Sequence, residues 1–215
     1  MTACSPTDAP VDCSRCSRLT AFRSQNRVNA PDWHNAPVPS FGKASAEFLI
    51  VGLAPGLKGA NRTGRPFTGD YAGDLLYATL LAEGFAKGIY GADPSDGLTL
   101  VGARITNAVR CVPPENKPTT AEIAACRDYL SATIAAMPKL KAILALGRIA
   151  HDSMLSALGQ RKSAWPFGHG RMHQVRPDLA LFDSYHCSRY NTNTGVLTPD
   201  MFLSVLAAVR KHLSR

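Results

Sequence analysis

The stretch from Glu47 to Asp70, EFLIVGLAPGLKGANRTGRPFTGD, decides the fold and contains the first functional segment. Its apolar opening is typical of a short buried strand. The part that follows, Gly52 to Asp70, holds five glycines, two prolines and one carboxylate, which excludes a helix. It has neither the G-K-[ST] of a P-loop nor a G-x-G-x-x-G motif, so nucleotide hydrolysis is disfavoured. What remains is a tight turn whose backbone amides can approach a flat ligand.

Outward from this stretch, apolar runs alternate with segments of helical periodicity. Strands are predicted in residues 47–53, 104–111, 141–147 and 180–186, and helices in 72–85, 119–137, 148–159 and 198–213. The alternation predicts an α/β fold with a mainly parallel sheet covered on both faces. Ligands bind such sheets at the carboxyl ends of the strands. Polar segments follow three of the predicted strands, so we place the functional site there.

Residues 1–46 are rich in Pro, Ser, Asn and Arg and have no sustained periodicity, so we interpret them as a loop-rich leader with short helical pieces. Residues 1–215 are expected to form a single domain. The 24 basic and 16 acidic side chains give a net charge of +8, which favours a polyanionic partner. Nucleic acid is the first hypothesis, and a basic housekeeping enzyme is the alternative.

The cysteines indicate a metal centre. No run approaches the roughly 18 apolar residues of a membrane span, and the N-terminus lacks the pattern of a signal peptide; we therefore expect a cytoplasmic protein whose cysteines do not form disulfides. Cys13 and Cys16 form a close pair, and Cys111 and Cys126 stand near a predicted strand and in a helix. Four thiolates suit zinc or a cubane iron–sulfur cluster. Alternatively, Cys111 and Cys126 are small buried hydrophobes.

Six motifs carry a resemblance to a known family. In chain order they are GLAPG, NRTGRPFTGD, TNAVRCVPPENKPT, ALGRIA, RKSAWPFGHG and SYHCSRYNTNTG. Together they resemble the family 5 uracil-DNA glycosylases of the uracil-DNA glycosylase superfamily, from about Cys13 to the C-terminus. The resemblance implies a three-layer αβα sandwich around a four-stranded parallel sheet. It also implies a structural [4Fe-4S] cluster held by Cys13, Cys16, Cys111 and Cys126, with zinc as the alternative.

The resemblance further implies a monofunctional DNA glycosylase of base excision repair, which hydrolyses the N-glycosidic bond of uracil after flipping the nucleotide out of duplex DNA. We expect it to act as a monomer. A lyase step is not expected, because no lysine lies in the first and last motifs to form a Schiff base, with Lys58 and Lys162 as formal exceptions. The alternatives are a non-catalytic iron–sulfur module that binds DNA damage, and a superfamily member that becomes covalently trapped on uracil-DNA.

Four side chains carry the chemistry that the resemblance implies. His186 would donate to the base oxygen on which negative charge grows, and Asn107 would pair with the polar edge of the base. Phe67 would stack on the base, and Asp70 would orient the attacking water and balance charge on the sugar. Each has a structural alternative: His186 as an ordinary hydrogen-bonding residue, Asn107 as a strand cap, Phe67 as core, and Asp70 as a helix N-cap.

The turn itself contributes small residues to the predicted base site. Gly52 and Gly56 would let the backbone approach the base. Ala54 stands where better-studied relatives place Asp or Asn, and an alanine cannot polarise a water. A site without a strict polar discriminator rejects isosteres poorly. Tolerance of hypoxanthine and xanthine beside uracil is therefore a hypothesis.

Three basic loops are predicted to contact DNA. The candidates for phosphate contacts are Lys58, Arg62, Arg65, Arg161, Lys162, Arg171 and Arg189. Arg189 or Tyr190 is expected to wedge into the gap that flipping leaves. Contacts of this kind predict an affinity that falls steeply with salt.

Overall fold

The computed structural model describes residues 7–214, so the first six residues of the leader and Arg215 lie outside it. Its centre is a sheet of strand order β4-β1-β5-β7-β6. The first four strands are parallel: β1 (Phe48–Gly52), β4 (Ala103–Asn107), β5 (Ala142–Leu146) and β7 (Leu179–Ser184). Every residue of these strands is buried. The predicted α/β fold with its four parallel strands is therefore confirmed.

Three short strands were not predicted. Strand β6 (Met172–Arg176) lies antiparallel to β7 at the edge of the sheet, with a register shift between Gln174 and Arg176. Only Val175 of this strand is buried, so it lacks an apolar run. The other two, β2 (Ala86–Lys87) and β3 (Thr99–Leu100), form a separate two-stranded ribbon.

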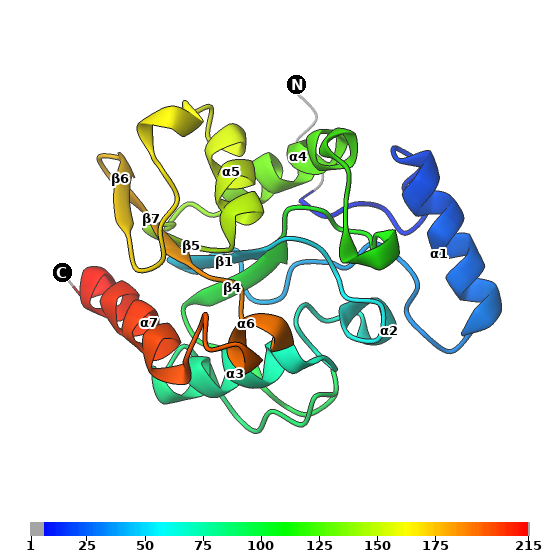
Figure 1. Ribbon diagram of the computed structural model, residues 1–215, viewed down its shortest axis with the longest axis horizontal. Helices are drawn as coiled ribbons and strands as arrows, with labels where there is room; N and C mark the ends of the chain where they lie inside the picture. The colour runs from blue at the N-terminus through cyan, green and yellow to red at the C-terminus, as the bar shows by residue number, and fades with distance from the viewer. Residues whose placement is uncertain (1–6, 215) are drawn as a thin grey trace.

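Helices cover both faces of the sheet, as Figure 1 shows. Helices α3 (Tyr71–Ala82) and α7 (Pro199–Leu213) lie on one face, and α4 (Thr120–Ala135) and α5 (Arg148–Ala157) on the other. Strand β1 shows why its run is continuously apolar: Phe48 and Ile50 pack toward the first pair of helices, whereas Leu49 and Val51 pack toward the second. The three-layer αβα sandwich is confirmed. No helix within residues 7–214 is long and apolar enough to cross a membrane.

Side chains set the starts of the main helices. Helix α4 begins with a capping box, in which the Thr119 side chain accepts from the backbone N–H of Glu122 and the Glu122 side chain accepts from the backbone N–H of Thr119. Thr198 caps α7 in the same position, ahead of Pro199. The short elements are α2 (Ala60–Thr63), α6 (Arg189–Asn193) and two 3₁₀ turns, η1 (Pro114–Asn116) and η2 (Lys162–Ala164). Helix α2 is a single turn within Gly52–Asp70, where no helix was predicted, so that prediction is wrong at these four residues.

Polar contacts attach the leader to the sheet. It contains α1 (Ser17–Asn29), which is longer than the short helical pieces predicted. The fully buried guanidinium of Arg110 donates to Asp8 at 3.2 Å and to Ser40 at 2.8 Å. Phe41 exchanges two backbone hydrogen bonds with Ile105 of β4. The end of the leader thus lies along the outer edge of β4.

Candidate active site

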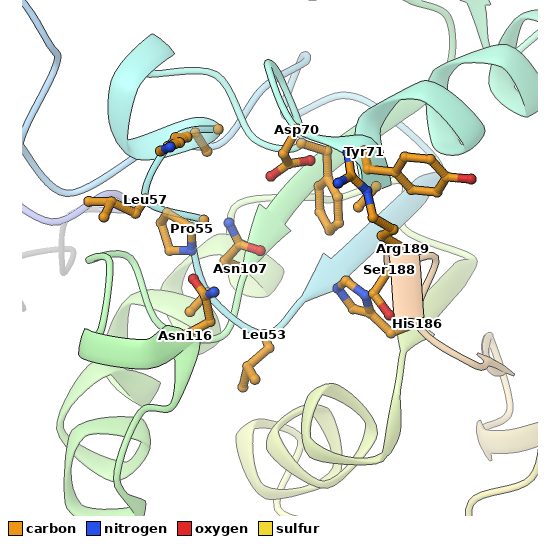
Figure 2. A pocket seen from close by; sticks show the side chains of 17 residues that line it. Leu53, Pro55, Leu57, Asp70, Tyr71, Asn107, Asn116, His186, Ser188 and Arg189 are labelled. Atoms are coloured by element: carbon orange, nitrogen blue, oxygen red, sulfur yellow. The ribbon is translucent and has the colours of Figure 1, made fainter. Parts of the chain in front are cut away.

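A cavity of about 570 Å³ opens at the carboxyl edge of the sheet. Its walls come from the turn after β1, the end of β4, the start of α3 and the segment after β7 (Figure 2). The structure thus brings the predicted segments to one place. The predicted site residues that line it are Ala54, Gly56, Lys58, Phe67, Asp70, Asn107, His186 and Arg189.

Gly52 makes room for two of these side chains. A Cβ atom on Gly52 would overlap the Asn107 amide oxygen and would lie 2.5 Å from Cζ of Phe67. Phe67 itself is held in the left-handed region, at φ 53°, with only 7% of its surface exposed. The hydroxyl of Tyr90 donates to the Phe67 carbonyl at 3.2 Å, which fixes this conformation. The ring of Phe67 therefore lies against the end of β1 because no side chain separates them.

Asp70 caps a helix and also lines the cavity. Its Oδ1 accepts from the backbone N–H of Gly73 at 3.2 Å, which makes it the N-cap of α3. Its Oδ2 faces Gly56 and Gly59, where a Cβ atom would collide with the carboxyl group. Burial raises the pKa of Asp70 above its ordinary value, and the two cap hydrogen bonds from the backbone oppose that shift.

Asn107 lines the cavity and has an unsatisfied acceptor. It is the last residue of β4 and is 3% exposed. Its Oδ1 is buried and has no hydrogen-bond partner among residues 7–214. A buried acceptor without a partner costs about 1–3 kcal/mol, so a ligand that donates to it would bind favourably. This position suits the polar edge of a nucleobase.

His186 stands two residues beyond the end of β7, and its ring lies beside that of Phe67, with 6.1 Å between centroids and an interplanar angle of 33°. Its backbone carbonyl accepts from the side chain of Asn191 at 2.8 Å. Desolvation lowers the pKa of His186 to about 4. The imidazole is consequently neutral at pH 7 and offers one N–H donor without a charge.

Sequence reasoning missed several residues that line the cavity. They are Leu53, Pro55, Leu57, Gly59, Ala60, Tyr71, Ala72, Asn116 and Ser188. Asn116 follows Glu115, and both have a positive φ, 58° and 55°. Asn adopts the left-handed conformation more readily than most residues. An Asn after two prolines was thus a signal of a sharp turn that we did not use.

Most of the predicted DNA contacts are on the surface. Lys58 and Arg62 are exposed beside the cavity, and Arg189 lies over the ring of Tyr71, 5.2 Å from its centroid. Lys162 is exposed on η2. Tyr190, next to Arg189, is 74% exposed.

Arg65 is a correction to the predicted contacts. Its side chain is 5% exposed, and both terminal nitrogens donate to the Asp96 carboxylate, at 2.8 and 2.7 Å. The third donor, Nε, is bonded to Thr68 at 2.7 Å. Because this side chain is buried and three of its N–H groups are already bonded, Arg65 does not face a phosphate backbone; it ties the loop that contains Asp96 to the segment before Phe67.

The four predicted metal ligands line one small cavity between the leader and α4. Cys13 lies in the leader, Cys16 caps α1, Cys111 follows β4, and Cys126 lies within α4. No three of their sulfur atoms lie within 4.8 Å of one another. A single zinc ion with Zn–S bonds of about 2.3 Å would need a tighter group. A cubane cluster places its own iron and sulfide atoms between the thiolates and fits a wider one.

Two of the four sulfur atoms accept hydrogen bonds from N–H groups. The buried side chain of Arg23 donates to Sγ of Cys111 at 2.9 Å. The backbone N–H of Arg110 donates to Sγ of Cys126 at 3.3 Å. These contacts favour negative charge on both sulfurs. The residues present therefore fit a cluster held by four thiolates.

A second group of titratable side chains lies outside the cavity. Within the described part of the chain, His151, His173 and Asp183 are the one group with donor atoms close enough to share an ion. However, Nδ1 of His151 lies 2.6 Å from Oδ1 of Asp183, which is the length of a charge-assisted hydrogen bond. The group is thus a hydrogen-bonded network.

Comparisons with known proteins agree with this geometry. The sequence profile of the Uracil DNA glycosylase superfamily matches residues 39–210. The chain is 44% identical to the Type-5 uracil-DNA glycosylase of Thermus thermophilus, over 93% of each chain. It is 39% identical to the Type-5 enzyme of Mycobacterium tuberculosis, over 93% of this chain and 77% of that one. For the Type-5 enzyme of Pyrobaculum aerophilum the identity is 36%, over 91% and 87%.

Proposed function

Because the chain belongs to the uracil-DNA glycosylase superfamily, and within it to the type-5 enzymes, we propose that it hydrolyses the N-glycosidic bond of uracil in DNA. The observation that carries the proposal is one cavity containing three complementary groups. They are an unpaired amide oxygen on Asn107, a neutral imidazole on His186 and a buried carboxylate on Asp70.

On the base side, the reaction leaves negative charge. As the bond between C1′ and the base nitrogen breaks, its electron pair goes to the base and accumulates on a carbonyl oxygen. The N–H of His186 donates to that oxygen, and the low pKa of the ring supports a neutral donor at pH 7. Asn107 accepts from the ring N–H of the base, and Phe67 stacks on its face. A donor of this kind contributes roughly 10²- to 10³-fold in rate.

On the sugar side, the reaction leaves positive charge. Asp70 as a carboxylate balances that charge and orients a water toward C1′, to which the hydroxyl of the water adds. The departing base takes up a proton, so the products are a free base and an abasic site. The placement of Oδ2 opposite Gly56 and Gly59 supports this role, because the carboxylate there can approach a bound sugar.

The same cavity supports a broad choice of base. The turn beside Asn107 contributes Leu53, Ala54 and Pro55, none of which has a polar side chain. Hypoxanthine and xanthine are therefore proposed as further substrates, since an apolar wall rejects isosteres weakly. Excision assays on uracil, hypoxanthine and xanthine mispairs would test this, and activity on uracil alone would contradict it.

A [4Fe-4S] cluster is proposed at Cys13, Cys16, Cys111 and Cys126. When bound, it would supply a structural crosslink between the leader, the segment after β4 and helix α4. The wide spacing of the sulfurs and the donors to Cys111 and Cys126 support a cluster over zinc. Brown colour with a stoichiometric iron content would agree with this proposal, and a colourless zinc protein would overturn it.

Duplex DNA is the proposed partner of a monomeric enzyme. The exposed cations Lys58, Arg62, Lys162 and Arg189 support binding to phosphates, and Arg189 or Tyr190 at the start of α6 supports a wedge beside the cavity. A cytoplasmic location is proposed because thiolate ligands need a reducing compartment.

A single assay separates this function from its rivals. The protein is incubated with a duplex that contains one U:G mispair, and alkali then cleaves any abasic site. Free uracil and a cleaved strand are expected. Retention of DNA without base release would indicate a binding module, and a heat-stable protein–DNA adduct would indicate covalent trapping.

A further inference from the structure

The His151–Asp183 pair is buried and lies outside the cavity. His151 is 1% exposed and Asp183 is fully buried. Nδ1 of His151 lies 2.6 Å from Oδ1 of Asp183, and Nε2 lies 2.8 Å from the carbonyl of Trp165. A carbonyl can only accept, so Nε2 carries a proton.

The second ring nitrogen also carries a proton. The other oxygen of Asp183, Oδ2, accepts from the backbone N–H of Gly168 at 3.2 Å and lies 3.2 Å from Nε2 of His173. The 2.6 Å separation between Nδ1 of His151 and Oδ1 of Asp183 is the length of a charge-assisted hydrogen bond. Burial opposes the charged ring, but the bond to Asp183 raises the pKa of His151 above its ordinary value. The proton between the pair therefore resides on His151, and the ring is an imidazolium. The other titratable group near it is Asp152 on its own helix.

The contacts of the pair lead to the segment Arg161–Arg171, RKSAWPFGHGR, which we call the basic loop. His151 bonds to Trp165 within this loop, and Asp183 bonds to Gly168. A further loop residue, His169, accepts from the backbone N–H of Tyr185 at 3.1 Å and stacks on the ring of Tyr185. The loop is thus joined to the strand end that precedes His186.

The basic loop carries exposed cations at both of its ends. Arg161, Lys162 and Arg171 all face solvent. A flexible loop would hold such charges in many arrangements and would lose that freedom on binding a phosphate backbone. A loop fixed from beneath presents them in one arrangement, so less entropy is lost.

We propose that the buried His151–Asp183 pair is a positioning device, in which an imidazolium fixes the basic loop in the arrangement that grips the DNA backbone. The inference rests on the proposed function, since DNA is the ligand that the loop would hold. His151 touches neither the substrate nor the reacting atoms. Its removal should consequently weaken DNA binding while the chemical step in the bound complex is retained.

The first experiment uses the wild-type protein. Nitrogen-15 NMR of the histidine rings at pH 7.5 reports the protonation of each ring nitrogen. Both nitrogens of His151 should carry hydrogen. A ring with one unprotonated nitrogen would overturn the proposal.

The second experiment compares DNA affinity with rate. In His151→Gln, the amide can donate to only one of the two acceptors. Its Kd for a duplex with a non-cleavable uracil nucleotide should rise roughly 2- to 30-fold, the range for residues that act through others. The single-turnover rate with saturating enzyme should change less than about twofold. An unchanged Kd would overturn the proposal.

Three further variants control for folding and for the route of the effect. Ser153→Ala, on the same helix, removes a buried bond to the Ile149 carbonyl and should leave Kd unchanged. If His151→Gln does not fold, His173→Gln should weaken binding in the same direction, and wild-type affinity there would overturn the proposal. In a Lys162→Ala background the effect of His151→Gln on Kd should shrink; full additivity would show that the pair does not act through the loop. Uracil release by the wild type, measured in parallel, tests the proposed function separately.

Discussion

Gly52→Ala should lower the rate of uracil excision without unfolding the protein. The new Cβ atom would lie 2.5 Å from Cζ of Phe67 and closer still to the amide oxygen of Asn107. Ordinary contacts between such atoms begin near 3.4 Å, so the ring must move by about 1 Å or the strand must shift. A misplacement of about 1 Å at a catalytic site costs about 10²-fold in rate. We therefore expect single-turnover uracil excision to fall about 100-fold.

The assay uses a U:G duplex with enzyme in excess, so that the rate reports the bound complex. Ile50→Val is the matched control, because Ile50 lies on the same strand, is buried in the core and does not line the cavity. It should cost about 1 kcal/mol of stability and leave the rate unchanged. If Gly52→Ala keeps wild-type activity, the ring of Phe67 and the amide of Asn107 do not position the base.

Four further predictions test Asp70, the cysteines and the ion pair between Arg65 and Asp96. Asp70→Asn keeps the helix cap, because Asn caps as well as Asp, so the Tm should be unchanged. The rate of excision should fall roughly 10²- to 10³-fold, because the carboxylate is lost. A lower Tm with full activity would leave Asp70 only its capping role. The excision rate of the wild type should decrease as the pH falls through the pKa of Asp70, which burial raises. The reason is that a protonated carboxyl group cannot balance the charge on the sugar. A rate–pH profile should show this loss at acid pH, and the same loss in Asp70→Asn would assign it to another group. Cys126→Ala should give a colourless protein of low iron content, and a variant that stays brown would exclude Cys126 as a ligand. Asp96→Ala leaves the buried Arg65 unpaired, so denaturant unfolding should show a free energy of unfolding that is lower by roughly 3 kcal/mol. Wild-type stability would show that the ion pair between Arg65 and Asp96 does not stabilise the fold.

The elements that the sequence predicted correctly share a simple local signal. Strands β1 and β5 are buried on both faces, so almost every residue in them is apolar. Asn107 and His186 could be placed because each lies at or just beyond the end of a strand, and the ends of parallel strands meet at one edge. Here a short stretch of sequence contains all the information that the prediction needs.

The elements that escaped prediction depend on distant partners. Helix α1 buries Leu19, Arg23 and Asn26, so its inner face has helical spacing but only one apolar residue. Arg65 is of a type that is usually exposed, and its burial depends on Asp96, which lies 31 positions away in the sequence. Neither arrangement is visible until the chain has folded.

The leader also covers an edge of the central sheet. It lies along the outer edge of β4, where Phe41 pairs with Ile105 and the carbonyl of Gly42 accepts from Arg104. A chain without the leader would present unpaired backbone groups beside apolar side chains, a template to which strands of other molecules add. Self-association is therefore the first failure to expect of a truncated chain. The contacts that hold the leader on β4 therefore also protect this edge of the sheet from other molecules.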